Sequence, residues 1–161
     1  MKAGLVLLLC TLPLAGQKVH ELCAPCHAEQ VADFYSHTHF QKGLSCDVCH
    51  GASVKHRTST GAVAPDRVAA PDEAPALCGA CHTAQGKEYS ASQHGKLVLA
   101  RSKTRAANCA TCHGVHNARA ARAMLQQCQK CHATLPASHP ALTAGSTCFG
   151  CHSKHTLAAK K

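Results

Sequence analysis

The pentapeptide Cys-x-x-Cys-His occurs six times in this chain of 161 residues, and the copies use twelve of its thirteen cysteines. They occupy residues 23–27, 46–50, 78–82, 109–113, 128–132 and 148–152. Aromatic residues make up only 3% of the sequence, and Trp is absent. A chain of this composition cannot bury enough apolar surface to offset its conformational entropy. Something held by cysteine and histidine must therefore fill its interior.

The spacing of the motif fits the attachment of c-type haem. Two thiols add to the two vinyl groups of one haem, and the histidine after the second cysteine becomes the proximal ligand of the iron. The sequence therefore predicts six covalent haems. The predicted attachment cysteines are Cys23, Cys26, Cys46, Cys49, Cys78, Cys81, Cys109, Cys112, Cys128, Cys131, Cys148 and Cys151. The predicted proximal ligands are His27, His50, His82, His113, His132 and His152.

Zinc binding and disulfide formation are two other uses of paired cysteines. Cysteine pairs about 15–20 residues apart resemble zinc ribbons, but zinc does not require a histidine after every second cysteine. With 14 His in 161 residues, six out of six by chance is on the order of one in a million. Disulfides explain neither the fixed gap of two residues nor the histidines. The fixed spacing and the six histidines therefore indicate haem.

The sixth position of each iron decides what the protein can do. A second histidine suits electron transfer, a methionine raises the potential, and an open position admits a substrate. Met124 falls inside an expected helix, where packing is its simpler role. Eight histidines lie outside the motifs, and their recurrence along the chain nominates six as distal ligands. The six are His39, His56, His94, His116, His139 and His155, which leaves His20 and His37 as spares. For any single one, a solvated surface histidine is the alternative.

Two of these histidines cannot serve the nearest iron. His116 and His155 each follow a motif histidine by three residues, so on one helical turn both rings project from the same face. They cannot hold one iron from opposite sides, and each must bind a neighbouring haem. His56 follows its motif histidine by six residues, and the sequence does not assign it to a particular haem.

The motifs divide the chain into three similar units at about 20–56, 78–116 and 128–155. Residues 57–77 are expected to form a loop or linker, because Pro65, Pro71 and Pro75 stand among small and polar residues. Neither part has a core without haem, so residues 17–161 are predicted to form one hexahaem cytochrome c domain.

The expected fold class is mainly α-helix and coil with little or no β-structure. The clearest predicted helix is 117–135, with Asn117 as its cap, and shorter helices are expected around 21–35 and 73–89.

The N-terminus predicts an exported protein. Lys2 precedes a short apolar run, and residues 1–16 are expected to form a signal peptide. An uncleaved anchor and a lipoprotein cut at Cys10 are the alternatives. The signal leads us to expect a periplasmic, extracellular or outer-membrane-associated location. No other segment is long and apolar enough to span a membrane.

The motif arrangement resembles the bacterial multihaem c-type cytochromes, especially those with closely paired haem motifs. The resemblance covers nearly all of the chain after the signal. It implies short helices and long loops wrapped around a row of close haems, and in such proteins a trailing histidine commonly binds a neighbouring iron.

The resemblance implies an electron carrier or conduit in anaerobic-type respiration rather than an enzyme. Expected partners are redox proteins: a quinol-oxidising membrane cytochrome, a terminal reductase or an outer-membrane conduit. A homo-oligomer or filament, with a spare histidine such as His20 reaching the next subunit, is also open. The alternative function is a multihaem reductase of nitrite, hydroxylamine or tetrathionate with one open iron. The nitrite reductases usually carry Lys in place of a motif histidine, and this chain has no such motif.

The formal charge of +9 is unevenly distributed. From Tyr89 onward the chain has ten Lys or Arg and no acidic residue. Haem propionates would offset much of this charge, so nucleic-acid binding is not expected. The basic C-terminal part either docks an acidic redox partner or pairs with the propionates.

Overall fold

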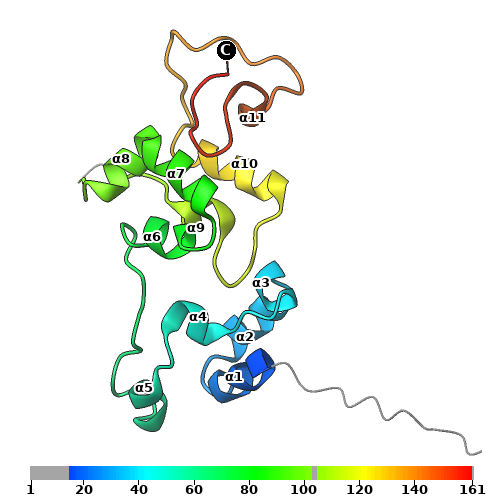
Figure 1. Cartoon of the computed structure of the whole chain (residues 1–161). Helices are drawn as coiled ribbons and strands as arrows, with labels where there is room; N and C mark the ends of the chain where they lie inside the picture. Colours follow the sequence, from blue (N-terminus) through cyan, green and yellow to red (C-terminus); the bar gives the residue numbers. More distant parts are fainter. Residues whose placement is uncertain (1–14, 103–104, 161) are drawn as a thin grey trace, which may run out of the picture.

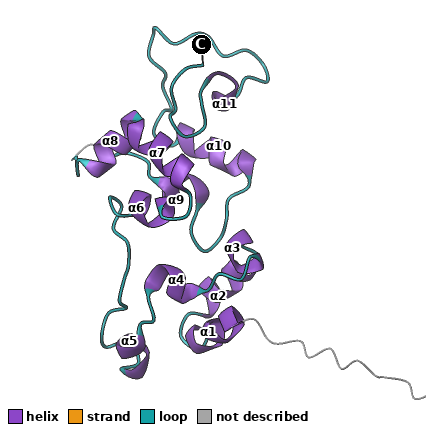
Figure 2. Cartoon of the chain, viewed as in Figure 1, coloured by secondary structure: helices purple, strands orange, loops and turns teal. Residues whose placement is uncertain are grey.

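The computed structural model describes residues 15–102 and 105–160, and this part of the chain is built from helices and loops without any strand (Figures 1 and 2). An isolated antiparallel bridge joins His152 to Ala159. The predicted fold class, helix and coil, is confirmed. Most of the predicted signal, residues 1–14, lies outside the described residues. None of the described helices is long and apolar enough to cross a membrane.

The described residues form eleven helices, most of them shorter than two turns. They are α1 Ala15–Cys23, α2 Ala28–Tyr35, α3 Thr38–Gln41, α4 Cys46–His50, α5 Val54–Thr58, α6 Ala74–Gly79, α7 Thr83–Ala91, α8 Gln93–Leu99, α9 Cys109–His113, α10 Ala121–Gln129 and α11 Cys148–Cys151. The molecule is elongated: α1 to α5 lie at one end, α6 to α10 in the middle, and α11 with the C-terminal loop at the other end (Figure 1).

The first two units share one local architecture. In both, a helix ends at or just after the first cysteine of the unit, and a new helix starts directly after the motif histidine. A short helix that carries the isolated histidine near its start follows, His39 in α3 and His94 in α8. In the third unit, residues 133–147 form turns and loops instead. Pro136 and Pro140 lie in this stretch and disfavour a helix there.

The second motif of each unit begins a helix at its first cysteine, and a polar residue precedes that cysteine. The three N-cap residues are Ser45, Asn108 and Thr147. The Asn108 side chain accepts from Thr111 N at 2.9 Å, and Thr111 Oγ1 accepts from Asn108 N at 3.2 Å, which makes a reciprocal capping box. This cap fixes the start of the helix that presents Cys109, Cys112 and His113.

Loss of this cap should be measurable. Asn108→Ala is expected to lower the unfolding free energy of the holoprotein by about 1 kcal/mol, because the first turn of α9 loses its side-chain acceptor. Asn117→Ala is the matched control, since Asn117 caps no helix and should cost about 0.5 kcal/mol or less. Urea unfolding followed by circular dichroism measures both. Equal losses in the two variants would contradict the role given to Asn108.

The prediction of one helix over 117–135 with an Asn117 cap is wrong. The helix α10 spans only Ala121–Gln129, and Ala120 is its N-cap. Before it, the chain folds back on motif four: Arg119 N donates to His113 O, and Arg119 Nη1 donates to Ala110 O and Thr111 O. These contacts hold residues 114–120 in a loop. Helix propensity depends on the local sequence and does not include such contacts.

The expected loop over 57–77 is fastened to the second motif rather than free. Asp66 Oδ2 accepts from Ser53 N at 2.7 Å. Arg67 donates from Nε to Cys49 O at 2.7 Å and from Nη2 to Val48 O at 2.8 Å. Both carbonyls belong to the motif helix α4, so the loop brings a cation against one haem-attachment motif.

The apolar core is thin. Among the described residues, the buried apolar side chains are Val31, Ala74, Tyr89 and Val98. The most deeply buried large side chain is a histidine, His20, at 1% exposure. A polypeptide of this length normally buries far more, so the fold depends on material that the side chains themselves do not supply.

Candidate functional site

Each motif histidine lies opposite one histidine from outside the motifs, and each nominated distal histidine takes part once. The ring centroids are 6.0 Å apart for His27 and His56, 6.0 Å for His50 and His116, 5.9 Å for His39 and His82, 6.2 Å for His113 and His155, 5.9 Å for His94 and His132, and 6.2 Å for His139 and His152. We number these pairs as sites 1 to 6 by the order of their motifs.

The separation of the rings fits an iron held between them. An imidazole nitrogen binds a first-row metal at about 2 Å, and the ring centre lies roughly 1 Å behind that nitrogen. Two imidazoles on opposite sides of one metal therefore place their centres about 6 Å apart. Rings in direct contact would stack closer than this. The interplanar angles, 17° at site 6 to 35° at site 5, show that the rings of each pair are close to parallel.

The first and second units exchange histidines. His39 of the first unit faces His82, the motif histidine of site 3 in the second unit. In return, His116 of the second unit faces His50, the motif histidine of site 2 in the first unit. The geometric argument from the sequence, that His116 cannot serve its own motif, agrees with this placement.

The second and third units exchange histidines in the same way. His94 of the second unit faces His132 of site 5, and His155 of the third unit faces His113 of site 4. Only the two outermost sites draw both histidines from one unit.

Those outermost sites are site 1, with His27 and His56, and site 6, with His139 and His152. The three units are therefore joined by two reciprocal exchanges. Each unit needs a histidine from an adjacent unit to complete at least one of its pairs.

Backbone carbonyls orient four of the twelve paired rings. The Nδ1 atoms of His50, His56, His139 and His152 lie 3.0, 2.7, 2.7 and 2.9 Å from the carbonyl oxygens of Arg67, Val63, Pro140 and Leu157. A carbonyl can only accept, so Nδ1 carries the proton in each ring. Nε2 is then left with its lone pair, the form that binds a metal.

The environment also keeps several rings neutral. Burial lowers the pKa of His94, with the neighbouring His132 ring as the second cause. Burial also lowers the pKa of His39 and, together with nearby histidines, of His113 and His116. A lowered pKa means that these imidazoles hold no extra proton at neutral pH, so their lone pairs are available.

The two spare histidines have local structural roles. His37 Nδ1 accepts from His39 N at 3.0 Å and caps α3, the helix that presents His39. His20 is enclosed by aromatic rings, with Phe40 at 4.9 Å and Phe34 at 5.4 Å between centroids. Its Nδ1 lies 3.1 Å from Cys46 Sγ. His20 is therefore enclosed within the first unit.

No disulfide joins the motif cysteines, all of which lie among the described residues, and within each unit the first cysteine of one motif contacts the first cysteine of the other. The contacts join Cys23 to Cys46, Cys78 to Cys109 and Cys128 to Cys148. Burial, followed by the neighbouring thiol, raises the pKa of Cys46 and Cys109 to about 11. Within the described residues, no three His, Cys, Asp or Glu side chains converge as a zinc site requires.

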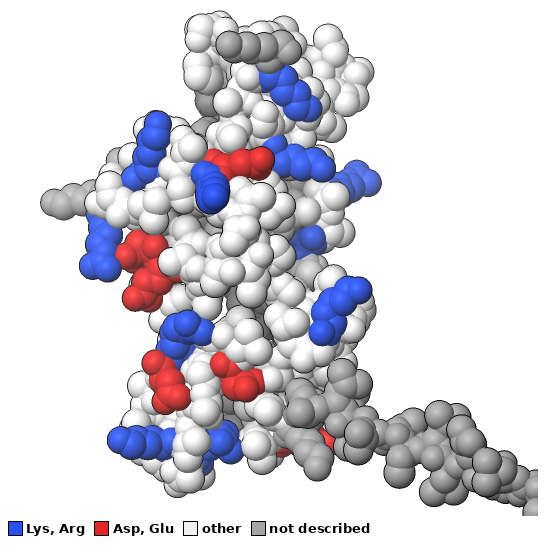
Figure 3. Space-filling view, in the orientation of Figure 1, with Lys and Arg blue, Asp and Glu red and all other residues white. Residues whose placement is uncertain are grey.

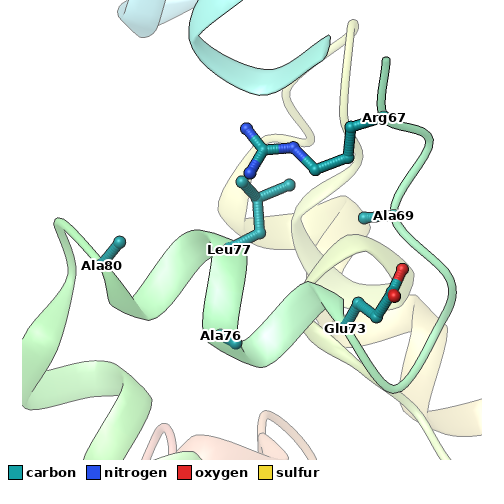
Figure 4. A pocket seen from close by; sticks show the side chains of 6 residues that line it. All are labelled: Arg67, Ala69, Glu73, Ala76, Leu77 and Ala80. Carbon is teal, nitrogen blue, oxygen red and sulfur yellow. The ribbon is translucent and has the colours of Figure 1, made fainter. Parts of the chain in front are cut away.

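A cavity of about 330 Å³ lies between the fastened loop and α6. Figure 4 shows Arg67 and Leu77 projecting toward each other across it, with Ala69 and Glu73 beside them. Leu77 directly precedes Cys78, and Ala80, another lining residue, stands between Cys78 and Cys81. The cavity therefore lies beside the attachment thiols of site 3.

A model of one protein family matches residues 32–114, just over half of the chain; its description is cytochrome c7 and related cytochrome c. The matched segment contains the motifs of sites 2, 3 and 4. Searches of the curated proteins and of the solved structures each found no match.

Proposed function

Because the chain belongs to the family of cytochrome c7 and related cytochrome c, we propose that it binds six covalent haems, each between two histidines, and conducts electrons along them. Membership of the family makes the protein a multihaem electron-transfer cytochrome that carries c-type haem. What we propose beyond this is the number of haems, the histidines that bind each iron and the order in which electrons pass between the haems. The observation that carries it is the set of six histidine pairs, each with the separation that one iron between two imidazoles requires.

The residues at each site fit the group that they would hold. Two thiols would bind the haem at one edge, the motif histidine would ligate the iron from one side, and the paired histidine from the other. Bound haem supplies an iron that changes charge by one electron. The protein contributes neutral imidazoles, fixed ring orientations and closed sixth positions, which exclude substrate and limit rearrangement when the charge changes.

Contacts between the motifs support one unbranched order of the sites, from 1 to 6. The first cysteines meet within each unit, which places sites 1 and 2, 3 and 4, and 5 and 6 side by side. Cys49 of site 2 lies near Cys78 and Cys81 of site 3. Helix α10, which leads into site 5, packs on α9 of site 4. The row would therefore follow the elongated shape of the molecule (Figure 1).

The haem count is tested by intact mass and by haem analysis of the mature holoprotein. Both are expected to give six haems per chain, because all twelve thiols occur in complete motifs. A Cys128→Ser, Cys131→Ser variant should lose one haem and keep five. Fewer than six haems in the wild-type protein, made with a complete haem-attachment system, would contradict the proposal.

Low-temperature EPR of the oxidised holoprotein tests the ligands. All iron should be low-spin, because each site has two histidines. The spectra should be rhombic, since the ring pairs are closer to parallel than to perpendicular. A high-spin signal from about one haem in six would instead favour the reductase alternative with an open iron.

We also propose that the protein works outside the cytoplasm, in the periplasm or beyond, in an anaerobic-type respiratory chain. The expected signal at residues 1–16 and the covalent haem motifs support this location. Two histidines per iron favour low potentials, which suit electron exchange with a quinol-oxidising membrane cytochrome and a terminal reductase or outer-membrane conduit.

A further inference from the structure

Acidic side chains occupy the same position in the first two units of the chain. Asp33 lies six residues after His27. Glu88 lies six residues after His82. Each belongs to the helix that begins directly after that motif histidine, α2 in the first unit and α7 in the second. In the third unit the same position holds Ser138. The whole chain has only eight acidic residues, so the recurrence of two of them at one position indicates a shared role.

Each of these carboxylates lies close to the histidine that returns from the next unit. Glu88 Oε2 lies 3.3 Å from Nδ1 of His155. Asp33 Oδ1 accepts from Asn117 Nδ2 at 3.4 Å, and Asn117 directly follows His116. Burial is the main cause that lowers the pKa of His116, and the Asp33 carboxylate acts in the opposite direction. Both returning histidines therefore have a carboxylate of the preceding unit in their surroundings.

The third unit, which has Ser138 in place of the carboxylate, draws both histidines of site 6 from within itself. Four other paired rings place Nδ1 against a neutral backbone carbonyl instead, those of His50, His56, His139 and His152. On the face drawn in Figure 3, Asp and Glu side chains form small separate groups among Lys and Arg and make no continuous acidic patch. The two carboxylates are therefore local features of the two exchanges between units.

A carboxylate in this position would act on an iron through the imidazole. Its oxygens can only accept, so it favours the tautomer in which Nδ1 carries the proton and Nε2 keeps the lone pair for the metal. An anionic neighbour also makes the imidazole a stronger donor to the metal. Oxidised iron carries one more positive charge than reduced iron, so both effects stabilise the oxidised form. The midpoint potential of that haem is lowered as a result.

We propose that Asp33 and Glu88 are positioning residues, which hold His116 and His155 in the metal-binding tautomer and lower the midpoint potentials of the haems at sites 2 and 4. This inference rests on the proposed function, because it concerns the irons that two of the six histidine pairs would hold. The two carboxylates act on alternate sites, so they make the potential vary along the row rather than shift all haems together.

The test uses the fully loaded holoprotein, with Asp33→Asn and Glu88→Gln made separately. Each substitution removes one negative charge and keeps an oxygen that can accept from Nδ1, so all six haems should stay low-spin. Each variant is the matched control for the other, because both change the net charge equally. Stepwise reduction followed by proton NMR measures the potential of each haem, since the signals of a haem are assigned by their contacts with its own two histidines.

Asp33→Asn is expected to raise the potential of site 2, and Glu88→Gln that of site 4. At a fixed solution potential, the ratio of reduced to oxidised iron at that site should rise about threefold to tenfold, or roughly 30 to 60 mV, because tenfold corresponds to about 59 mV for one electron. The change is limited because the Glu88 side chain is 54% exposed, so that water screens part of its charge.

An unchanged potential at site 2 in Asp33→Asn, or at site 4 in Glu88→Gln, would overturn the proposal. Equal shifts at both sites in each variant would also overturn it, because they would show a general effect of net charge. Failure of the proposed function is recognised separately, because wild-type protein with fewer than six haems or with high-spin iron would fail the mass and EPR measurements before any variant is compared.

Discussion

A chain cut after Arg119 is expected to lose more than the two sites that it no longer contains. Sites 5 and 6 disappear with their motifs, and site 4 loses His155, its second histidine. The shortened holoprotein should therefore carry four haems, of which one is high-spin and binds carbon monoxide. His94 should be left without its partner His132. Units that folded independently would instead give four low-spin haems.

Mass analysis, EPR and carbon monoxide titration of the truncated protein distinguish these outcomes. Full-length protein with Cys128, Cys131, Cys148 and Cys151 changed to serine is the matched control. It removes the same two haems but keeps His155, so site 4 should stay low-spin. Carbon monoxide binding by the control as well as by the truncated chain would contradict the assignment of His155 to site 4.

Replacement of His116 by alanine is expected to open a single iron, that of site 2, although His116 follows the motif of site 4. About one sixth of the iron should become high-spin, and carbon monoxide should bind with that stoichiometry. The midpoint potential of that haem should rise, because a strong donor to the iron is lost. His37→Ala is the matched control, since His37 is a nearby histidine that caps α3 and faces no motif histidine.

The identity of the opened site can be read directly. If proteolysis releases the high-spin haem on the peptide that contains Cys46 and Cys49, the result supports the exchange of histidines between the first two units. Its recovery on the peptide that contains Cys109 and Cys112 would show that His116 serves its own motif. Unchanged low-spin spectra in His116→Ala would remove His116 from the ligand set altogether.

The sequence allows the attachment motifs to be recognised but not the pairing of the histidines. The motifs are local, so their chemistry is visible in five consecutive residues. The geometry of one helical turn shows that His116 and His155 must look elsewhere. It cannot show which motif histidine each of them faces, because that depends on how the chain folds between the two histidines of a pair. His39 and His82 are likewise joined by a fold, not by a pattern.

The residues directly before and after several motifs have structural roles that the spacing of the motifs does not reveal. Ser45, Asn108 and Thr147 each precede a motif cysteine, and all three prove to be helix N-caps. Gly51 and Gly114 directly follow motif histidines and have φ of 73° and 77°. A Cβ at Gly114 would lie 2.2 Å from Asn117 O, so the tight turn requires glycine. Such local features could be predicted, whereas the anchoring of Arg119 that shortens α10 could not.

The exchange of histidines between units sets a timetable for assembly. Under the proposed function, a chain that crosses the membrane from its N-terminus can complete a site only when the later of its two histidines has emerged. That order is site 1 at His56, site 3 at His82, site 2 at His116, site 5 at His132, site 6 at His152 and site 4 at His155. Site 2 waits 66 residues after His50 (116 − 50), and site 4 waits 42 after His113 (155 − 113). Under the proposed function, a newly exported chain would thus pass through stages in which a haem motif is present before its second histidine, and site 4 would be completed after the other five, at His155.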